Sequence, residues 1–375
     1  MISSVYGVAS LISQGVEPQE IIEIMKGNGK EWLSISRFML DVASQCMRLY
    51  YYDAAEKVLN LILDLSRKNG DRATEGDCLM KMGRLMWSED RGADAVKFYS
   101  EAATIYKERG DILSLGSVHF HTSTILWLMD DLEEALKHSE QAYQAIQNVE
   151  KDGVLEVLVR MGSILFGMQR YEEAYKKYME ALRLSEELDG IKTKGICLWE
   201  VGAILEIKGR LEEALESYFE AIKVKQETRD RVGEQLCRIR VGKVLLKLEK
   251  MGEALEQFNE ALSISRSDGN QLGEAVAFFH IGVSNIILKN NRRVREAFEK
   301  TILTFEKGYS RVHLLVALNI YLDYLLSRGE KSRAEDVSNK ISQFKIEDVS
   351  KDASEQKRRV NERIEEIRKI LNAKK

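Results

Sequence analysis

The amino-acid sequence predicts an all-α protein, built as a solenoid of about eight antiparallel helix-turn-helix repeats. A pattern of one glycine, one alanine, one aromatic residue and a second alanine recurs every forty residues along most of the chain. Proline, which breaks helices, occurs once in 375 residues, at Pro18. Hydrophobic residues make up 44% of the chain, which is enough for a core that continues from one repeat to the next.

The first segment, residues 1–30, departs from the repeat and is interpreted as an N-terminal helical cap. Gly15 interrupts a first short helix, and Pro18 suits the first turn of a second one. The run from Gly27 to Gly29 is typical of a helix end. Terminal repeats usually depart from the consensus in this way.

The repeat array is expected over residues 31–344, and its most regular copy contains Gly202, Ala214, Tyr218 and Ala221. Steps of four and three place the last three residues on one helical face. The glycine column reads Ala43, Gly83, Ser123, Gly162, Gly202, Gly242, Gly282 and Leu322. The aromatic column reads Leu59, Tyr99, Ser139, Tyr178, Tyr218, Phe258, Phe298 and Ser338. Because a glycine inside a helix costs about 1 kcal/mol relative to alanine, this column predicts a close contact between the paired helices.

Short polar pairs mark the ends of the repeats. They are Gly70-Asp71, Gly110-Asp111, Asp189-Gly190 and Asp268-Gly269, and each suits a helix C-cap followed by an N-cap. Acid pairs such as Glu212-Glu213 fall in the first turn of each second helix. Carboxylates there favour the positive end of the helix dipole, so we interpret these pairs as helix-stabilising and not as catalytic.

The last segment, residues 345–375, leaves the repeat and predicts a charged amphipathic helix. Its apolar stripe consists of Val360, Ile364, Ile367 and Leu371. An array must cover its last exposed apolar face, so a capping helix is one interpretation. A coiled-coil site for a partner or for a second copy of the chain is the alternative.

The repeat resembles the tetratricopeptide repeat, whose pattern places Gly, Ala and an aromatic residue at the same spacing. Leu198-x₂-Val201-Gly202-x₂-Leu205 followed by Ala214-x₃-Tyr218 matches it, as do the copies around Gly162 and Gly83. The closing proline of the family pattern is absent, with Gln226 and Arg266 in its place. The period is forty residues instead of 34, as in the long repeats of kinesin light chains, GoLoco-containing polarity adaptors and bacterial Rap-type regulators.

This resemblance implies a right-handed superhelix whose concave groove is lined by the first helix of each repeat and takes a peptide or helix. The groove residues that it implies are Arg84, Trp87, Phe120, Thr124, Trp127, Phe166, Trp199 and Lys243. Tryptophan is enriched at binding hot spots, which supports this reading. The alternative is that the large apolar side chains form ordinary core between neighbouring first helices. Further cations beside this face, including Arg160, Arg240 and Lys247, favour either an acidic partner or a solvated helix surface.

No sequence motif indicates catalysis. The chain has no P-loop, no dinucleotide-binding glycine motif, no nucleophile elbow and no kinase signature, so we predict no enzyme and no cofactor. The five histidines are scattered and form no metal-binding motif, so no metal site is expected either.

Charge and hydropathy exclude two further classes of partner. The net charge of −4 and the absence of a basic face argue against nucleic acid. No apolar run reaches the ~18 residues of a membrane span. The chain has four cysteines in no paired pattern, and its N-terminus has no charged leader, so the sequence favours a cytoplasmic protein.

The predicted function is that of an adaptor or scaffold that binds a partner protein or peptide in its groove. Two alternatives stay open. One is a regulator of the Rap-like kind that responds to a peptide or small ligand, and the other is a structural scaffold that self-associates through the C-terminal helix.

Overall fold

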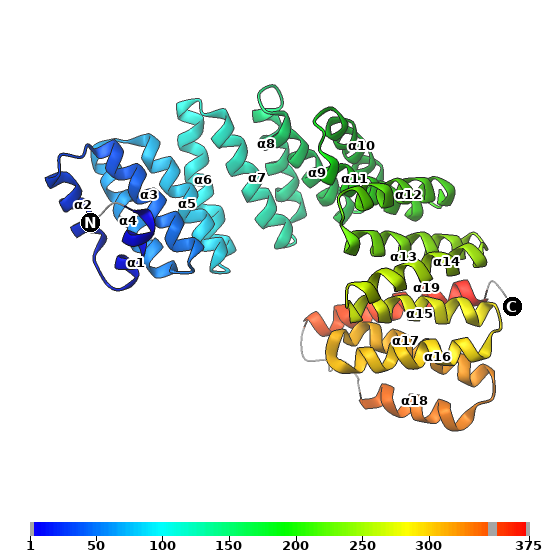
Figure 1. The fold of residues 1–375 in the computed structure, drawn as a ribbon. Helices are drawn as coiled ribbons and strands as arrows, with labels where there is room; N and C mark the ends of the chain where they lie inside the picture. The colour runs from blue at the N-terminus through cyan, green and yellow to red at the C-terminus, as the bar shows by residue number, and fades with distance from the viewer. Residues whose placement is uncertain (1–3, 344–350, 373–375) are drawn as a thin grey trace. The chain divides into compact units, whose positions relative to one another are not determined.

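The structure is a computed structural model that describes residues 4–343 and 351–372, and these residues form helices and no strand (Figure 1). In chain order the helices are α1 (Val5–Ser13), α2 (Pro18–Gly27), α3 (Trp32–Arg48), α4 (Tyr52–Asn69), α5 (Arg72–Ser88), α6 (Gly92–Arg109), α7 (Ile112–Leu128), α8 (Leu132–Ile146), α9 (Lys151–Gly167), α10 (Tyr171–Glu187), α11 (Ile191–Ile207), α12 (Leu211–Glu227), α13 (Arg231–Lys247), α14 (Met251–Ser267), α15 (Gln271–Ile287), α16 (Asn291–Thr304), the π-helix η1 (Phe305–Tyr309), α17 (Arg311–Ser327), α18 (Lys331–Gln343) and α19 (Lys351–Asn372). Within the described ranges, no helix combines the length and apolarity needed to cross a membrane. The predicted all-α solenoid is confirmed.

The chain divides into two compact units, residues 1–188 and 189–375. In unit 1, the hairpins α3–α4, α5–α6, α7–α8 and α9–α10 stack in chain order, and α1 and α2 pack against α3 and α4. In unit 2, the hairpins are α11–α12, α13–α14, α15–α16 and α17–α18, followed by α19. Each repeat of the sequence is therefore one helix hairpin.

Left-handed residues and side-chain caps set the helix ends. Gly70 and Gly110 adopt φ of 66° and 68°, and the following Asp71 and Asp111 accept hydrogen bonds from backbone N–H groups three residues on, as predicted. At the Asp268-Gly269 pair the N-cap is instead Asn270. Several turns place a residue other than glycine in the left-handed region, namely Tyr50, Asp90, Asp130, Gln169, Asp189, Arg229, Glu249 and Lys289.

The hairpins close by packing an aromatic ring against a glycine of the first helix. A Cβ atom added to Gly202 would lie 2.8 Å from the ring of Tyr218, and one added to Gly83 would lie 2.6 Å from the ring of Tyr99. The same pairing joins Gly162 with Tyr178, Gly242 with Phe258 and Gly282 with Phe298, and all five rings are buried. The predicted close contact is confirmed, and it is a contact of a ring with a helix backbone.

In two hairpins that lack this glycine, the residue at the aromatic position differs as well. In α7–α8 the two positions are Ser123 and Ser139, whose Oγ atoms lie 2.5 Å apart in a buried hydrogen bond. In α3–α4 they are Ala43 and Leu59, both fully buried. A larger residue on the first helix thus accompanies a smaller one on the second.

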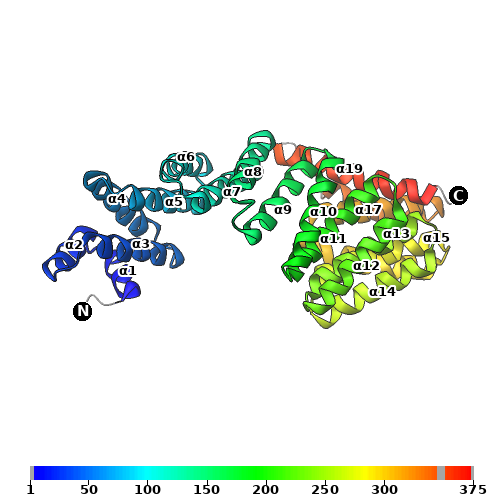
Figure 2. The same ribbon diagram turned by 90° about the horizontal axis from the view of Figure 1, so that it is seen from above.

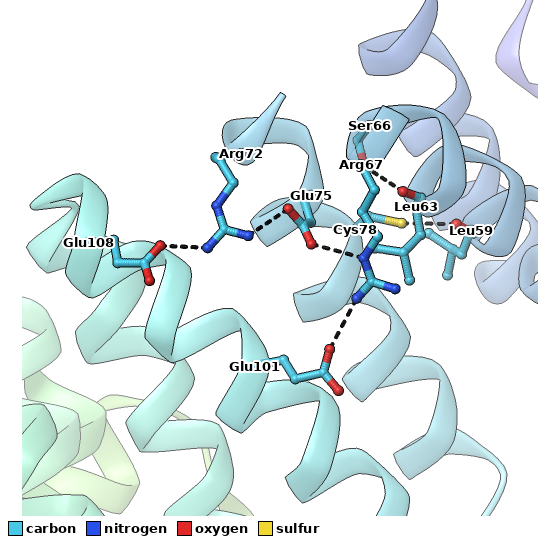
Figure 3. Close-up of polar contacts among 9 residues, drawn as sticks. All are labelled: Leu59, Leu63, Ser66, Arg67, Arg72, Glu75, Cys78, Glu101 and Glu108. Atoms are coloured by element: carbon cyan, nitrogen blue, oxygen red, sulfur yellow. Dashed lines mark hydrogen bonds and ion pairs between the residues drawn. The ribbon is translucent and has the colours of Figure 1, made fainter. Parts of the chain in front are cut away.

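A buried carboxylate links three helices of unit 1 (Figure 3). Glu75 of α5 accepts hydrogen bonds from Arg67 Nε of α4 at 2.9 Å and from Arg72 Nη1 at 2.8 Å. The two arginines also pair with Glu101 and Glu108 of α6 at 3.2 and 2.5 Å. Burial by itself would raise the pKa of Glu75, but the hydrogen bonds from Arg67 and Arg72 outweigh it and hold the pKa below its ordinary value.

The four cysteines, Cys46, Cys78, Cys197 and Cys237, are buried and unbonded to one another. The Cys78 thiol lies 3.1 Å from the backbone oxygen of Leu59, beside the network of Glu75 (Figure 3). Burial raises the pKa of the Cys78 thiol to about 12, so it stays protonated. The four cysteines therefore fill space in the core as small apolar side chains.

The ring contact predicts opposite effects for two glycine substitutions. Gly202→Ala forces its new Cβ into the Tyr218 ring and should cost about 1–3 kcal/mol of unfolding free energy, seen as faster hydrogen exchange in α11 and α12. At Gly252, which is also in a helix, an added Cβ atom would meet no neighbouring side chain or packed backbone within 4 Å. Gly252→Ala should therefore be neutral or stabilising by up to about 1 kcal/mol. Equal effects of the two changes would contradict the ring-contact account.

The Glu75 network predicts a pH-dependent loss of stability. Because the folded-state pKa of Glu75 is lowered, its contribution is present above the unfolded pKa of about 4.3 and is lost as the pH falls. Glu75→Gln should therefore lower the unfolding free energy of unit 1 by about 1–2 kcal/mol at pH 7. Chemical denaturation at pH 7 and pH 3 tests this, and a deficit that does not shrink at pH 3 would count against it.

Candidate functional site

Three of the six predicted groove residues of unit 1 lie on α7, namely Phe120, Thr124 and Trp127, and Arg160 of α9 lies beside them. The guanidinium carbon of Arg160 lies 4.5 Å from the ring centroid of Trp127 and 5.7 Å from that of Phe120. All three side chains are half-buried, so they line a surface and do not form core. Burial lowers the pKa of Arg160, and its Nε atom has no hydrogen-bond partner among the described residues. The pair of rings and the cation form the best-defined polar and aromatic feature of this face.

The remaining predicted residues of unit 1 are less closely grouped. Thr124 donates its hydroxyl to the backbone oxygen of Phe120 at 2.9 Å, so its own helix uses that donor. Phe166 packs edge-to-face on Tyr171 at a centroid distance of 5.5 Å. Trp87 is half-buried against the core of α5 and α6, and Arg84 is exposed.

In unit 2 the two predicted residues, Trp199 and Lys243, line one cavity of about 420 Å³. Trp199 packs edge-to-face on Tyr218 at 5.6 Å, and the guanidinium of Arg240 lies 5.5 Å from its ring. Further lining comes from α15, α17 and α19, and includes Phe279, His280, His313, Arg363, Glu366 and Ile367. The cavity therefore combines aromatic walls with several cations.

Helix α19 lies on this face of unit 2. Its side chains Val360, Ile364 and Ile367 are only 7%, 5% and 8% exposed. The helix packs against α17 and α15, and Figure 2 shows it along the first helices, with α12 and α14 on the other side. Whereas the sequence suggested a cap on the end of the array, the contacts place α19 across the first helices of the last hairpins.

Ion pairs fix the register of α19. The carboxylate of Glu366 lies 3.6 Å from Lys243 Nζ and 3.5 Å from Lys247 Nζ, both on α13. Arg368 donates two hydrogen bonds to Asp323 of α17, at 2.8 and 3.2 Å. These pairings could not be found from sequence spacing, because they join positions far apart in the chain.

The electrostatics of the site are dominated by cations. Lys247 also bonds Glu206 of α11 at 2.7 Å, and Glu206 in turn accepts from the Tyr218 hydroxyl at 3.2 Å. Burial lowers the pKa of Lys243, with Glu366 opposing this effect. Burial would raise the pKa of Glu366, but Lys243 and Lys247 outweigh it and the pKa is lowered. The two lysines therefore favour the ionised form of the Glu366 carboxylate.

The histidines near this cavity are neutral at physiological pH. Burial lowers the pKa of His313 to about 4, and Arg363, whose Nη1 lies 3.0 Å from its Nε2, acts in the same direction. Burial likewise lowers the pKa of His280 well below its ordinary value. The positive charge of the cavity thus comes from arginine and lysine.

Nothing in the described ranges assembles a metal site. No group of three or more His, Cys, Asp or Glu side chains is placed to hold a metal ion. In unit 1, His119 and His138 form a pair with their Nδ1 atoms 3.0 Å apart. Burial, aided by His138 and Lys107, lowers the pKa of His119 to about 4. Because the two Nδ1 atoms are hydrogen-bonded to each other, we interpret this pair as a structural contact.

Comparison with solved structures shows the same kind of fold in several proteins. The chain is similar to aspartyl phosphate phosphatase F from Bacillus subtilis, with a TM-score of 0.56 and 17% identity over 92% of this chain and 95% of that one. It is similar to the apo form of the quorum sensor NprR from B. thuringiensis, with a TM-score of 0.60 and 14% identity over 87% and 92% of the two chains.

A third similar structure is a signal transduction ATPase with a tetratricopeptide repeat sensor from Pyrococcus horikoshii. Its TM-score is 0.62 with 13% identity, and the match covers 87% of this chain and 52% of that one. At these identities the likeness shows the fold alone. No curated protein matches the sequence.

Family comparison agrees with the repeat. Residues 153–227 and residues 237–268 each match the tetratricopeptide repeat. The matched segments contain the glycine–aromatic pairs Gly162–Tyr178, Gly202–Tyr218 and Gly242–Phe258. The chain therefore carries tetratricopeptide repeats in these segments, and both of its units are solenoids of helix hairpins.

Proposed function

We propose that this chain is a protein-binding repeat protein whose first-helix faces take a helical or extended segment of a partner. The observation that carries the proposal is α19, an amphipathic helix seated on such a face in unit 2 through Ile364, Ile367 and Glu366. A face that accommodates one amphipathic helix has the shape and chemistry to accommodate another. The role is binding, without catalysis or a cofactor, and the cytoplasmic location stays a prediction from the sequence.

The charge of the face indicates what the partner segment presents. Lys243 and Lys247 point toward a carboxylate on α19, and Arg240 lies beside Trp199. A partner helix that places an acidic residue among aliphatic residues three and four apart would meet both features. Such a segment need not resemble α19 elsewhere.

Unit 1 supplies a second surface of the same kind. Trp127 and Phe120 hold the Arg160 guanidinium against their rings while its Nε atom has no partner among the described residues. A partner carboxylate or backbone oxygen could accept from that atom. Tryptophan and arginine are the residue types that contribute most at interfaces.

A second candidate function is a regulator that responds to a peptide or small ligand. The cavity of about 420 Å³ in unit 2, lined by Trp199, Phe279, Arg240 and Lys243, suits an anionic ligand with an apolar part. One structural neighbour is titled a quorum sensor, and another contains a tetratricopeptide repeat sensor. Ligand-dependent compaction in solution scattering would favour this candidate.

Peptide display on the immobilised full chain tests the proposed function. Peptides recovered from a random library should bind with measurable affinity, and Trp127→Ala should weaken those that use unit 1 by about 2 kcal/mol, or roughly thirtyfold. Phe219→Ala is the control, because Phe219 is an exposed aromatic residue on the second helix α12. If neither Trp127→Ala nor Lys243→Glu changes the affinity of the recovered peptides, the assignment of binding to these two faces is wrong.

A further inference from the structure

We propose that α19 is an intramolecular ligand of the unit 2 groove, which keeps this groove closed until an acidic amphipathic helix of a partner displaces it. The inference rests on the proposed function, since it names how access to one of the proposed binding faces is regulated. The groove in question is formed by α11, α13, α15 and α17 and contains Trp199, Lys243 and Phe279 in its lining.

The position of α19 is that of a bound segment. A helix that continued the solenoid would pack on the last hairpin in the way that α13 packs on α12 and α15 on α14. Helix α19 instead crosses several first helices, with contacts to α17 and α15 and ion pairs to α13 (Figure 2). Crossing several repeats on their first-helix side is how a groove holds a ligand.

Helix α19 is held by a narrow apolar stripe and by ion pairs. Three aliphatic side chains, Val360, Ile364 and Ile367, form its buried stripe. Around this stripe lie the pairs of Glu366 with Lys243 and Lys247 and of Arg368 with Asp323. The side chains of Arg368 and Asp323 are 40% and 39% exposed, and a pair this exposed adds little net stability. The contacts inside the hairpins are of another kind, because their aromatic rings are buried against the glycines of the first helices.

Packing under and beside α19 is incomplete. The cavity of about 420 Å³ lies between the helix and the groove floor. A crevice of about 710 Å³ runs along its flank, lined by Leu246, Lys247 and Glu249 of the groove and by Asn361 and Glu365 of the helix. Side chains of the chain do not fill this space, so another segment could occupy the same seat with different contacts.

Displacement of α19 from the groove would make the ammonium group of Lys243 available to a partner. When Glu366 withdraws, Lys243 loses its carboxylate, whereas Lys247 keeps Glu206. The chemistry that best replaces α19 is therefore one carboxylate next to aliphatic residues that face the groove, as with Glu366, Ile367 and Ile370. Because α19 is tethered, it competes at a high effective concentration, and only a partner that binds more tightly than the untethered helix succeeds.

Binding of the free helix to the full chain tests this proposal. The probe is a fluorescein-labelled peptide with the sequence of residues 351–372, measured by fluorescence anisotropy. Glu366→Arg places a cation against Lys243 and Lys247 and unseats the internal helix while the groove stays intact. This variant should bind the probe at least tenfold more tightly than the wild-type chain.

Two variants serve as controls. Glu362→Arg changes the same charge at a carboxylate that is 59% exposed and pairs with Arg358 of its own helix, so it should behave like wild type. Lys243→Glu combined with Glu366→Arg should remove binding of the probe, because the groove then repels the probe's Glu366 and attracts the internal helix again. Equal probe affinity of Glu366→Arg and wild type overturns the proposal.

Hydrogen exchange separates displacement from misfolding. In Glu366→Arg, exchange should rise in α19 and stay unchanged in α12 and α14. Faster exchange throughout α16, α17 and α18, with no gain in probe binding, would show that α19 is a structural cap and overturn the inference.

The outcome for the proposed function is read separately. If selected peptides whose binding requires Lys243 have the same affinity for the wild-type chain and for the Glu366→Arg variant, that result contradicts the closed groove, whereas the proposed function still holds. Probe binding to Glu366→Arg with no recovered partner peptide contradicts the proposed function alone.

Discussion

The contact of an aromatic ring with the backbone of a glycine determines the geometry of the repeat. The ring of Tyr218 lies where a Cβ atom of Gly202 would be, and four other hairpins repeat this arrangement. Because each ring sits at a fixed register on the second helix, it holds both helices at one distance and angle. The facing sides of the two helices are thereby buried against each other. The opposite side of each first helix does not take part in closing the hairpin. The proposed binding surfaces of both units lie on that opposite side.

Two kinds of contact result, and they differ in strength. Inside the hairpins, buried apolar side chains and rings are packed at contact distance, and their loss would create cavities or clashes. On the groove, α19 is held by a narrow stripe around Ile364 and by ion pairs to Lys243 and Asp323. The first kind sets the fold, and the second can be exchanged without disturbing it. This separation lets a rigid solenoid carry a variable occupant.

The candidate site was partly visible in the sequence. Helical spacing places Phe120, Thr124 and Trp127 on one face of one helix, and the structure finds the first and last of these in contact with Arg160. Trp199 and Lys243 lie on different helices, yet they line the same cavity, as the forty-residue register suggested. The sequence did not indicate the left-handed turn residues such as Tyr50 and Gln169, because their conformation is imposed by the closing of the hairpin and carries no glycine signal.

The sequence by itself determined the hairpins, their order and the pairs of small and large residues that close them. It could do so because each pair lies within one repeat, where helix periodicity and spacing fix which side chains meet. Only the tertiary structure decided the place of α19. Its stripe of Val360, Ile364 and Ile367 fits any apolar face, including the end of the array or a second chain. The choice of the groove depends on Glu366 reaching Lys243 and Lys247, residues whose proximity arises only after the hairpins of unit 2 have stacked.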